Sequence, residues 1–162
     1  MAVTPQEILI RPAQAADLAQ INRIIEAAIM TWELSDRVKR LTLPTYKYNE
    51  MDLQHLEVVV AEENSGIVGV AAWEQANRVD APKEKTALLL HGIYVDPARH
   101  REGIGRHLFR AAEEAVKKRQ LDGLVVKAQK GSEPFYLSQG MHKLAAEDPK
   151  REFENRYWKA HS

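Results

Sequence analysis

The sequence of 162 residues contains no cysteine. Disulfide bonds, metal sites built on thiolates and a cysteine nucleophile are therefore all excluded. The chain also carries no net charge, because 23 basic residues balance 23 acidic ones. A surface built for nucleic acid or for an anionic membrane usually has an excess of basic residues, so we expect neither nucleic acid nor membrane as a partner.

Long apolar runs and a signal peptide are missing as well. No stretch approaches the ~20 apolar residues that a membrane span needs. Residues 1–10 lack a basic region followed by an apolar run, so we expect no signal peptide and a cytoplasmic protein. The length, with 44% hydrophobic and 28% charged residues and no internal repeat, predicts a single globular domain over residues 1–162.

The hydrophobic pattern predicts a mixed α/β domain with a central β-sheet flanked by helices. Apolar residues recur at helical spacing over 17–30 and 103–119, and short apolar runs bounded by turn residues indicate strands. The run over 86–95 is so apolar that we expect a strand buried on both faces. The predicted strands span 8–10, 57–61, 67–73, 86–95, 124–126 and 153–159, and weaker helices are predicted around Arg37, at 50–56 and at 132–138.

One segment joins a predicted buried strand to the strongest predicted helix. It passes from Val95 through Asp96-Pro97 and a glycine-containing loop into the helix that starts at Gly103. A helix N-terminus exposes unpaired N–H groups with a partial positive charge, and glycine lets the backbone approach an anion closely. The segment therefore favours a phosphate site, the alternative being a tight loop whose glycines serve only the turn. Its basic residues are Arg99, His100, Arg101 and Arg106.

Two other phosphate-binding loops fit this segment less well. The P-loop pattern Gly-x-x-x-x-Gly-Lys-Ser/Thr is absent from the chain. The dinucleotide-binding pattern requires a third glycine at the position where this chain has Leu108.

The segment instead resembles motif A of the GCN5-related N-acetyltransferase (GNAT) family. Tyr94-Val95-Asp96-Pro97 precedes His100-Arg101-Glu102-Gly103-Ile104-Gly105, which follows the family pattern Gln/Arg-x-x-Gly-x-Gly/Ala except at His100. A second segment, Phe135-Tyr136-Leu137-Ser138-Gln139-Gly140-Met141, is similar to the family's aromatic-Tyr-x-x-x-Gly-Phe segment, with Met141 for phenylalanine. Gln129 falls where many members have asparagine. The order of elements also agrees over nearly the whole chain.

The resemblance implies an enzyme that uses acetyl-coenzyme A (acetyl-CoA) as cosubstrate, needs no metal and acetylates an amine. It implies pantetheine and thioester contacts for the strand before motif A, and pyrophosphate contacts for the motif itself. The residues to which it gives cofactor contacts are Ile93, Tyr94, Val95, His100, Arg101, Glu102, Gly103, Ile104, Gly105, Arg106 and Gln129.

Direct attack of a neutral amine on a thioester needs a base, an oxyanion donor and an acid for the departing thiolate. The resemblance implies Tyr136 as the acid, the alternative being a core tyrosine with a satisfied hydroxyl. His91 is the candidate base, because imidazole titrates near neutrality, although a histidine in an apolar run is often a hydrogen-bonded core residue. Glu74, Glu33 and a water chain are rival bases.

The acceptor is left open by the sequence: a small amine, an amino acid, an antibiotic and a protein lysine are all compatible. Four aromatic residues are candidates for an acceptor wall, with Glu33 and Glu74 to attract a cationic amine, and ordinary core packing is the alternative. Two further functions stay open, a non-catalytic acyl-CoA sensor and a protein-interaction domain. The sequence is also compatible with a homodimer, because the last strands of two such domains often pair with each other. The four aromatic residues are Trp32, Tyr46, Tyr48 and Trp73.

Overall fold

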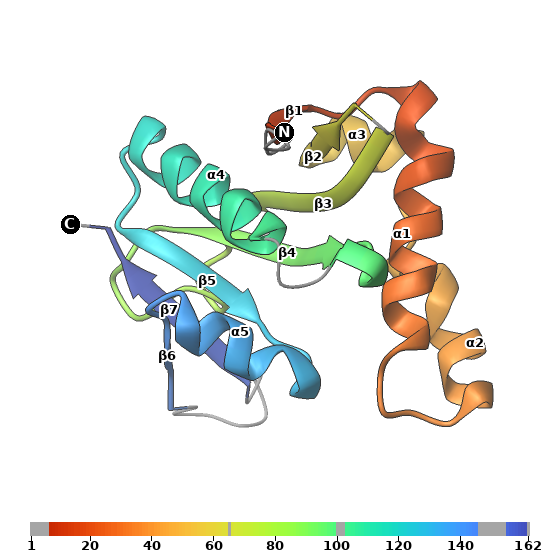
Figure 1. Ribbon diagram of the computed structural model, residues 1–162. Helices are drawn as coiled ribbons and strands as arrows, with labels where there is room; N and C mark the ends of the chain where they lie inside the picture. The colour runs from red at the N-terminus through yellow and green to blue at the C-terminus, as the bar shows by residue number, and fades with distance from the viewer. Residues whose placement is uncertain (1–6, 65, 100–102, 146–154, 162) are drawn as a thin grey trace, which may run out of the picture. The chain divides into compact units, whose positions relative to one another are not determined.

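The computed structural model of the protein describes residues 7–64, 66–99, 103–145 and 155–161 (Figure 1). The strands are β1 (Leu9–Pro12), β2 (Glu57–Glu63), β3 (Gly66–Gln75), β4 (Ala87–Val95), β5 (Gly123–Lys127), β6 (His142–Lys143) and β7 (Arg156–Ala160). The helices are α1 (Leu18–Met30), α2 (Asp36–Tyr46), α3 (Glu50–His55), α4 (Ile104–Lys118) and α5 (Glu133–Ser138). Short 3-10 turns are η1 (Ala15–Asp17), η2 (Pro97–Arg99) and η3 (Lys130–Ser132).

The described strands form a mixed sheet in the order β1-β2-β3-β4-β5-β7-β6. β4 and β5 run parallel, with Leu89 opposite Val125. β1 pairs antiparallel with β2, and β7 pairs antiparallel with both β5 and β6. The predicted mixed α/β fold with a central sheet and flanking helices is confirmed. The sequence pattern missed β6, because two exposed residues give no detectable alternation.

The chain is divided into two compact units. The first unit comprises Met1–Ala71 and Ile93–Leu108, and the second comprises Ala72–Gly92 and Phe109–Ser162. Motif A belongs to the first unit, whereas His91 and Tyr136 belong to the second. That residues 1–162 behave as one domain stays a prediction.

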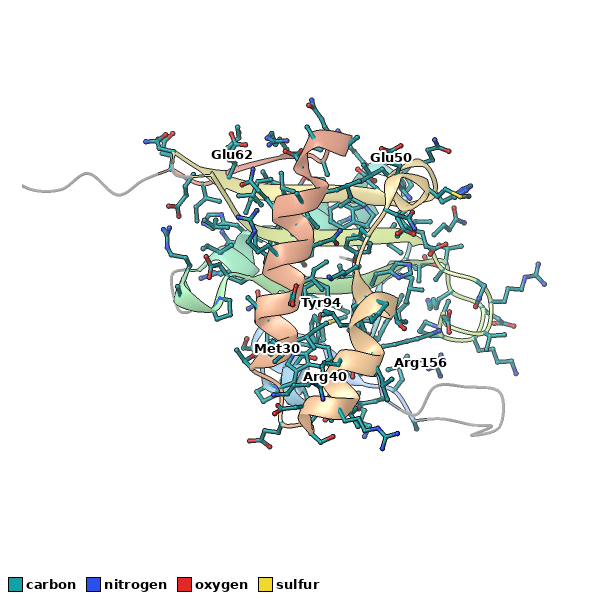
Figure 2. All side chains as sticks on the ribbon, turned by 90° about the vertical axis from the view of Figure 1, so that its right-hand side faces the viewer. Met30, Arg40, Glu50, Glu62, Tyr94 and Arg156 are labelled. Carbon is teal, nitrogen blue, oxygen red and sulfur yellow. The ribbon has the colours of Figure 1, made fainter. Side chains whose placement is uncertain are left out.

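Helix α2 of the first unit is longer than the sequence pattern suggested. It begins at Ser35, whose hydroxyl accepts a hydrogen bond from the Val38 N–H at 3.2 Å and so caps the helix. Lys39 is its buried residue, and the Lys39 ammonium donates to the Met30 carbonyl at the end of α1 at 2.8 Å. A cation there stabilises the helix C-terminus. Figure 2 shows α1 and α2 side by side, with Met30 and Arg40 labelled.

The expectation that β4 is buried on both faces is wrong for one face. Leu88 and Leu90 are buried, but His91 is exposed and its neighbours at alternate positions, Leu89 and Ile93, are only half-buried. Alternate side chains of a strand share a face, so β4 has one core face and one open face. The open face carries the candidate base.

Candidate functional site

The helix start of motif A is built on a glycine with a left-handed backbone. Gly103 has a φ of +81°, and no atom of the described residues would lie within 4 Å of a Cβ added there. The space around it is therefore open, and its backbone conformation is one that other residues adopt only at a cost. The His107 N–H donates to the Gly103 carbonyl at 3.1 Å, which opens the hydrogen-bond ladder of α4. Helices leave their first N–H groups without a partner inside the helix, so this end can receive an anion.

A second glycine holds the first turns of α4 close to β3 in the first unit. A Cβ on Gly69 would lie 2.9 Å from both Ile104 Cγ2 and Leu108 Cδ1, and 3.3 Å from the Tyr94 carbonyl oxygen. No larger residue fits without displacing them. Ile104 and Leu108 are 1% and 0% exposed, so this packing fixes where the helix starts.

The turn before motif A is organised by Asp96. The Asp96 N–H donates to the Val68 carbonyl on β3 at 2.9 Å, and the Asp96 carboxylate accepts from the Ala98 N–H at 3.0 Å. The Arg99 N–H donates to the Asp96 carbonyl at 2.8 Å and completes η2. The Asp96-Pro97 pair, read from sequence as the end of a strand, thus forms a tight 3-10 turn tied to β3.

Arg99 does not extend toward the helix start as a free cation. Its Nη2 atom donates to both carboxylate oxygens of Glu63, at 2.6 Å and 2.5 Å. Glu63 is the last residue of β2, and only 3% of its side chain is exposed. Residues 36 positions apart share no local sequence pattern, so sequence reasoning does not find Glu63. The positive charge that the sequence placed beside the anion site is here paired with a buried carboxylate.

The remaining predicted cofactor residues of the first unit differ in exposure. Ile93 and Val95 are half-buried, whereas Tyr94 is 7% exposed and faces the core. Gly105 is half-buried and Arg106 exposed, both in the first turn of α4. The predicted contacts at His100, Arg101 and Glu102 lie outside the described residues.

In the second unit, His91 and Glu74 form a histidine–carboxylate pair. The His91 Nε2 atom lies 2.5 Å from the Glu74 Oε2 atom. The two side chains are 35% and 43% exposed, so solvent and a substrate can reach both. His91 is on the open face of β4, and Glu74 is near the end of β3. Two residues that the sequence offered as rival bases are thus brought together.

Tyr136 lies on α5 and is 4% exposed. Its ring packs edge-to-face against Phe135, with the centroids 5.2 Å apart. Helix α5 is attached to β7 at its first turn, where the Tyr157 hydroxyl donates to the Glu133 carboxylate at 2.6 Å. This hydrogen bond, with burial second, raises the pKa of the Tyr157 phenol. Gln129 is exposed, and its carbonyl accepts from the Ser132 N–H at 2.9 Å.

The residues proposed for an acceptor wall do not share one environment. Trp32 and Tyr46 are half-buried and pack edge-to-face with ring centroids 5.4 Å apart. Tyr48 is held by Asn22 on α1, which bonds its backbone N–H and carbonyl at 2.8 Å each. Trp73 is 1% exposed and belongs to the core, so it offers no ring surface to solvent.

Among the described residues, no cluster of three or more histidine, aspartate or glutamate side chains is arranged to hold a metal ion. No described helix is both long and apolar enough to cross a bilayer.

Known proteins of similar sequence and structure identify the family. The profile described as "Acetyltransferase (GNAT) domain" matches residues 35–155. No curated protein matches the chain in sequence. The similar solved structures that follow share under 25% identity with this chain, so each supports the fold alone.

A GNAT family acetyltransferase from Brucella melitensis, solved with acetyl-CoA, has 22% identity and a TM-score of 0.65, covering 96% of this chain and 89% of that one. The PaiA N-acetyltransferase from Thermoplasma acidophilum, solved with coenzyme A, has 15% identity and a TM-score of 0.75, covering 95% and 99%. AtaT, solved with acetyl-methionyl-tRNAfMet, has 17% identity and a TM-score of 0.60, covering 95% of each chain. With a family profile matched over 35–155, this chain belongs to the GNAT family of acetyltransferases.

Proposed function

We propose that this protein transfers the acetyl group of acetyl-CoA to an amine by direct attack. The main support for this proposal is the backbone of Gly103 at the start of α4. In this member of the GNAT family, Gly103 has a left-handed conformation and open space around it. A backbone of this kind suits close approach of a pyrophosphate to helix N–H groups. The relatives solved with acetyl-CoA and coenzyme A support the choice of ligand.

The cosubstrate would lie along the open face of β4 and at the start of α4. Ile93, Tyr94 and Val95 would contact pantetheine and the thioester, mostly through backbone groups because the Tyr94 ring faces the core. Gly103, Ile104, Gly105 and Arg106 would hold the pyrophosphate, with His100, Arg101, Glu102 and Gln129 as further proposed contacts. Because the Ile104 side chain is buried, its share of phosphate binding would come from its N–H.

The chemistry needs three proton transfers, two from the nitrogen and one to the sulfur. The His91 imidazole, hydrogen-bonded to Glu74, would take the proton of the incoming ammonium, and the carboxylate would stabilise the imidazolium that forms. The amine nitrogen then bonds to the carbonyl carbon, a backbone N–H of β4 stabilises the oxyanion, and the carbon–sulfur bond breaks. The Tyr136 hydroxyl would protonate the departing thiolate, and the tyrosinate would regain a proton as the acylated nitrogen loses its second one, so the products are an amide and free coenzyme A.

The acceptor is proposed as an amine on a small molecule or on a protein. The half-buried Trp32–Tyr46 pair and exposed Glu33, all in the first unit, would favour a cationic amine with an apolar portion. The complex of AtaT with acetyl-methionyl-tRNAfMet illustrates that chains of this fold serve large acceptors as well.

The test is a panel of amines incubated with protein and acetyl-CoA, read by thiol release and by mass spectrometry of the product. The panel contains polyamines, amino acids, aminoglycosides and lysine peptides. At least one amine should gain an acetyl group with an equal amount of thiol released, and His91→Gln should suppress both. Binding of acetyl-CoA with no product from any amine would instead favour the non-catalytic sensor, and no binding at all would favour a protein-interaction domain.

A further inference from the structure

The ion pair between Glu63 and Arg99 connects the end of β2 to the turn that leads into α4. Arg99 closes η2 and stands four positions before Gly103 in the sequence. Its guanidinium holds both oxygens of a carboxylate whose side chain is only 3% exposed. A buried carboxylate requires such a partner, since an unpaired charge in the interior is strongly unfavourable. The pair therefore restrains the main chain at Arg99.

Three contacts in the first unit act on the same short stretch of backbone. Glu63 holds the side chain of Arg99, the Val68 carbonyl accepts from the Asp96 N–H at 2.9 Å, and Gly69 lies against Ile104 and Leu108. They restrain residues 96–99 and the first turns of α4. A site whose ligands are backbone N–H groups depends on such restraints, because those groups cannot adjust by rotating a side chain.

We propose that Glu63 and Arg99 are positioning residues for the nucleotide end of acetyl-CoA: their ion pair sets the backbone that receives the pyrophosphate. The proposal rests on the proposed function. Arg99 acts here through its bond to Glu63 and not as a phosphate ligand. The contribution to affinity is pre-organisation, since a loop ordered before binding loses less entropy on binding.

The sign of one substitution separates positioning from a direct charge effect. Glu63→Gln removes the negative charge that faces the Arg99 guanidinium. If Arg99 were a phosphate ligand restrained by Glu63, this variant would bind coenzyme A more tightly. If the pair positions the backbone, Glu63→Gln and Arg99→Met both weaken the binding of coenzyme A. The dissociation constant of the double variant is then no higher than the higher of the two single-variant values.

A matched control lies next to Glu63 in the sequence. Glu62 accepts a hydrogen bond from Arg11 at 2.6 Å in another ion pair of the first unit. Because successive side chains of a strand point to opposite faces, Glu62 lies on the face of β2 opposite to Glu63. Glu62→Gln therefore makes the same chemical change one residue away and breaks a pair that does not touch η2. Melting temperatures of all variants identify any general loss of stability, and binding is measured well below the lowest of them.

The experiment is calorimetric titration of each variant with coenzyme A and with 3′-phosphoadenosine 5′-diphosphate, the nucleotide half of the same molecule. Glu63→Gln and Arg99→Met should raise both dissociation constants by about tenfold, while Glu62→Gln leaves them unchanged. Unchanged or tighter binding by Glu63→Gln, or equal weakening by Glu62→Gln, would overturn the proposal. If the wild type binds neither ligand, the proposed function itself fails, and this inference fails with it.

Discussion

The Nε2 atom of His91 lies 2.5 Å from the Oε2 atom of Glu74 on the open side of the sheet in the second unit. A carboxylate in contact with an imidazole fixes the orientation of the ring and stabilises its protonated form. We propose that the two residues act together as one base and are not alternatives. Glu33, the other carboxylate considered as a base, lies in the first unit and is exposed.

The pair predicts a large loss of activity when the imidazole is removed. His91→Gln keeps a hydrogen-bonding group beside Glu74 but cannot take a proton, so kcat/KM at neutral pH should fall by about 10²–10⁴-fold. His142→Gln is the matched control, because His142 is also an exposed histidine on a strand. Because residues that act as a unit are not additive, the double variant with Glu74→Gln should lose little more. Unchanged kcat/KM in His91→Gln would remove His91 from the mechanism.

The first turn of α4 predicts a position-dependent effect of arginine on coenzyme A affinity. Arg106 and Arg110 are both exposed and lie one helical turn apart on α4. Neutralising Arg106 by Arg106→Gln should weaken binding about threefold to tenfold and reduce its salt dependence, whereas Arg110→Gln should do little, since the helix-end effect fades after the first turn. Equal losses for both variants would indicate a diffuse charge effect and no local phosphate site.

The proposed role of Tyr136 predicts a change in turnover without a change in binding. Tyr136→Phe should lower kcat by about 10²-fold while the dissociation constant of coenzyme A stays the same, because protonation of the thiolate occurs only in the reaction. Tyr157→Phe serves as the control: it also removes a phenol hydroxyl of the second unit, the one bonded to Glu133. That variant should lower the melting temperature and spare kcat. Full activity in Tyr136→Phe would leave the acid unidentified.

The network of Arg11, Asp17 and Glu62 predicts a loss of stability at acid pH. Arg11 donates to the Asp17 carboxylate at 2.8 Å, and this hydrogen bond, which outweighs the effect of burial, lowers the pKa of Asp17. A lowered pKa means that the folded state binds the proton less readily than the unfolded state. The contribution of Asp17 is therefore complete above the unfolded value near 4 and is lost as pH falls through the lower folded value.

Asp17→Asn should remove about 2–3 kcal/mol of stability at neutral pH, as expected for a buried charge-assisted pair. Denaturant unfolding at a series of pH values measures this. Below pH 4 the difference between wild type and variant should shrink. A difference that stays constant from neutral pH to strongly acid pH would mean that the carboxylate charge contributes nothing.

The helices and strands could be predicted from the sequence where the local hydrophobic pattern was strong. The apolar stripe of α4 and the short apolar runs of β2, β3 and β5 report burial directly, so their existence was predicted. Helix α2 was underestimated because its buried residue is Lys39, which no hydrophobic pattern reveals, and because Pro44 lies inside it. The open face of β4 could not be predicted because its residues Leu89, Ile93 and Val95 are apolar but only half-buried.

The candidate site could be predicted only in part, because only its local motifs are visible in the sequence. Motif A is a local signature, so Gly103 and Arg106 could be selected from neighbouring letters. The partners of Arg99 and His91 are set by strand pairing over long sequence distances, 36 residues for Glu63 and 17 for Glu74. Sequence could name His91 and Glu74 as candidates but not as a pair, and it counted Arg99 among the basic residues of the phosphate segment without revealing that its guanidinium holds Glu63.

Thermal melting with and without acetyl-CoA tests whether acetyl-CoA binds at the start of α4. The variants are Gly103→Glu and, as control, Gly131→Glu; a Cβ meets nothing within 4 Å at either glycine, but only Gly103 has a positive φ. Ligand at a hundred times its dissociation constant should stabilise wild type and Gly131→Glu by about 2.7 kcal/mol and leave Gly103→Glu unshifted. No shift of the wild type at millimolar acetyl-CoA would contradict the account, and the glycine would then serve only the turn.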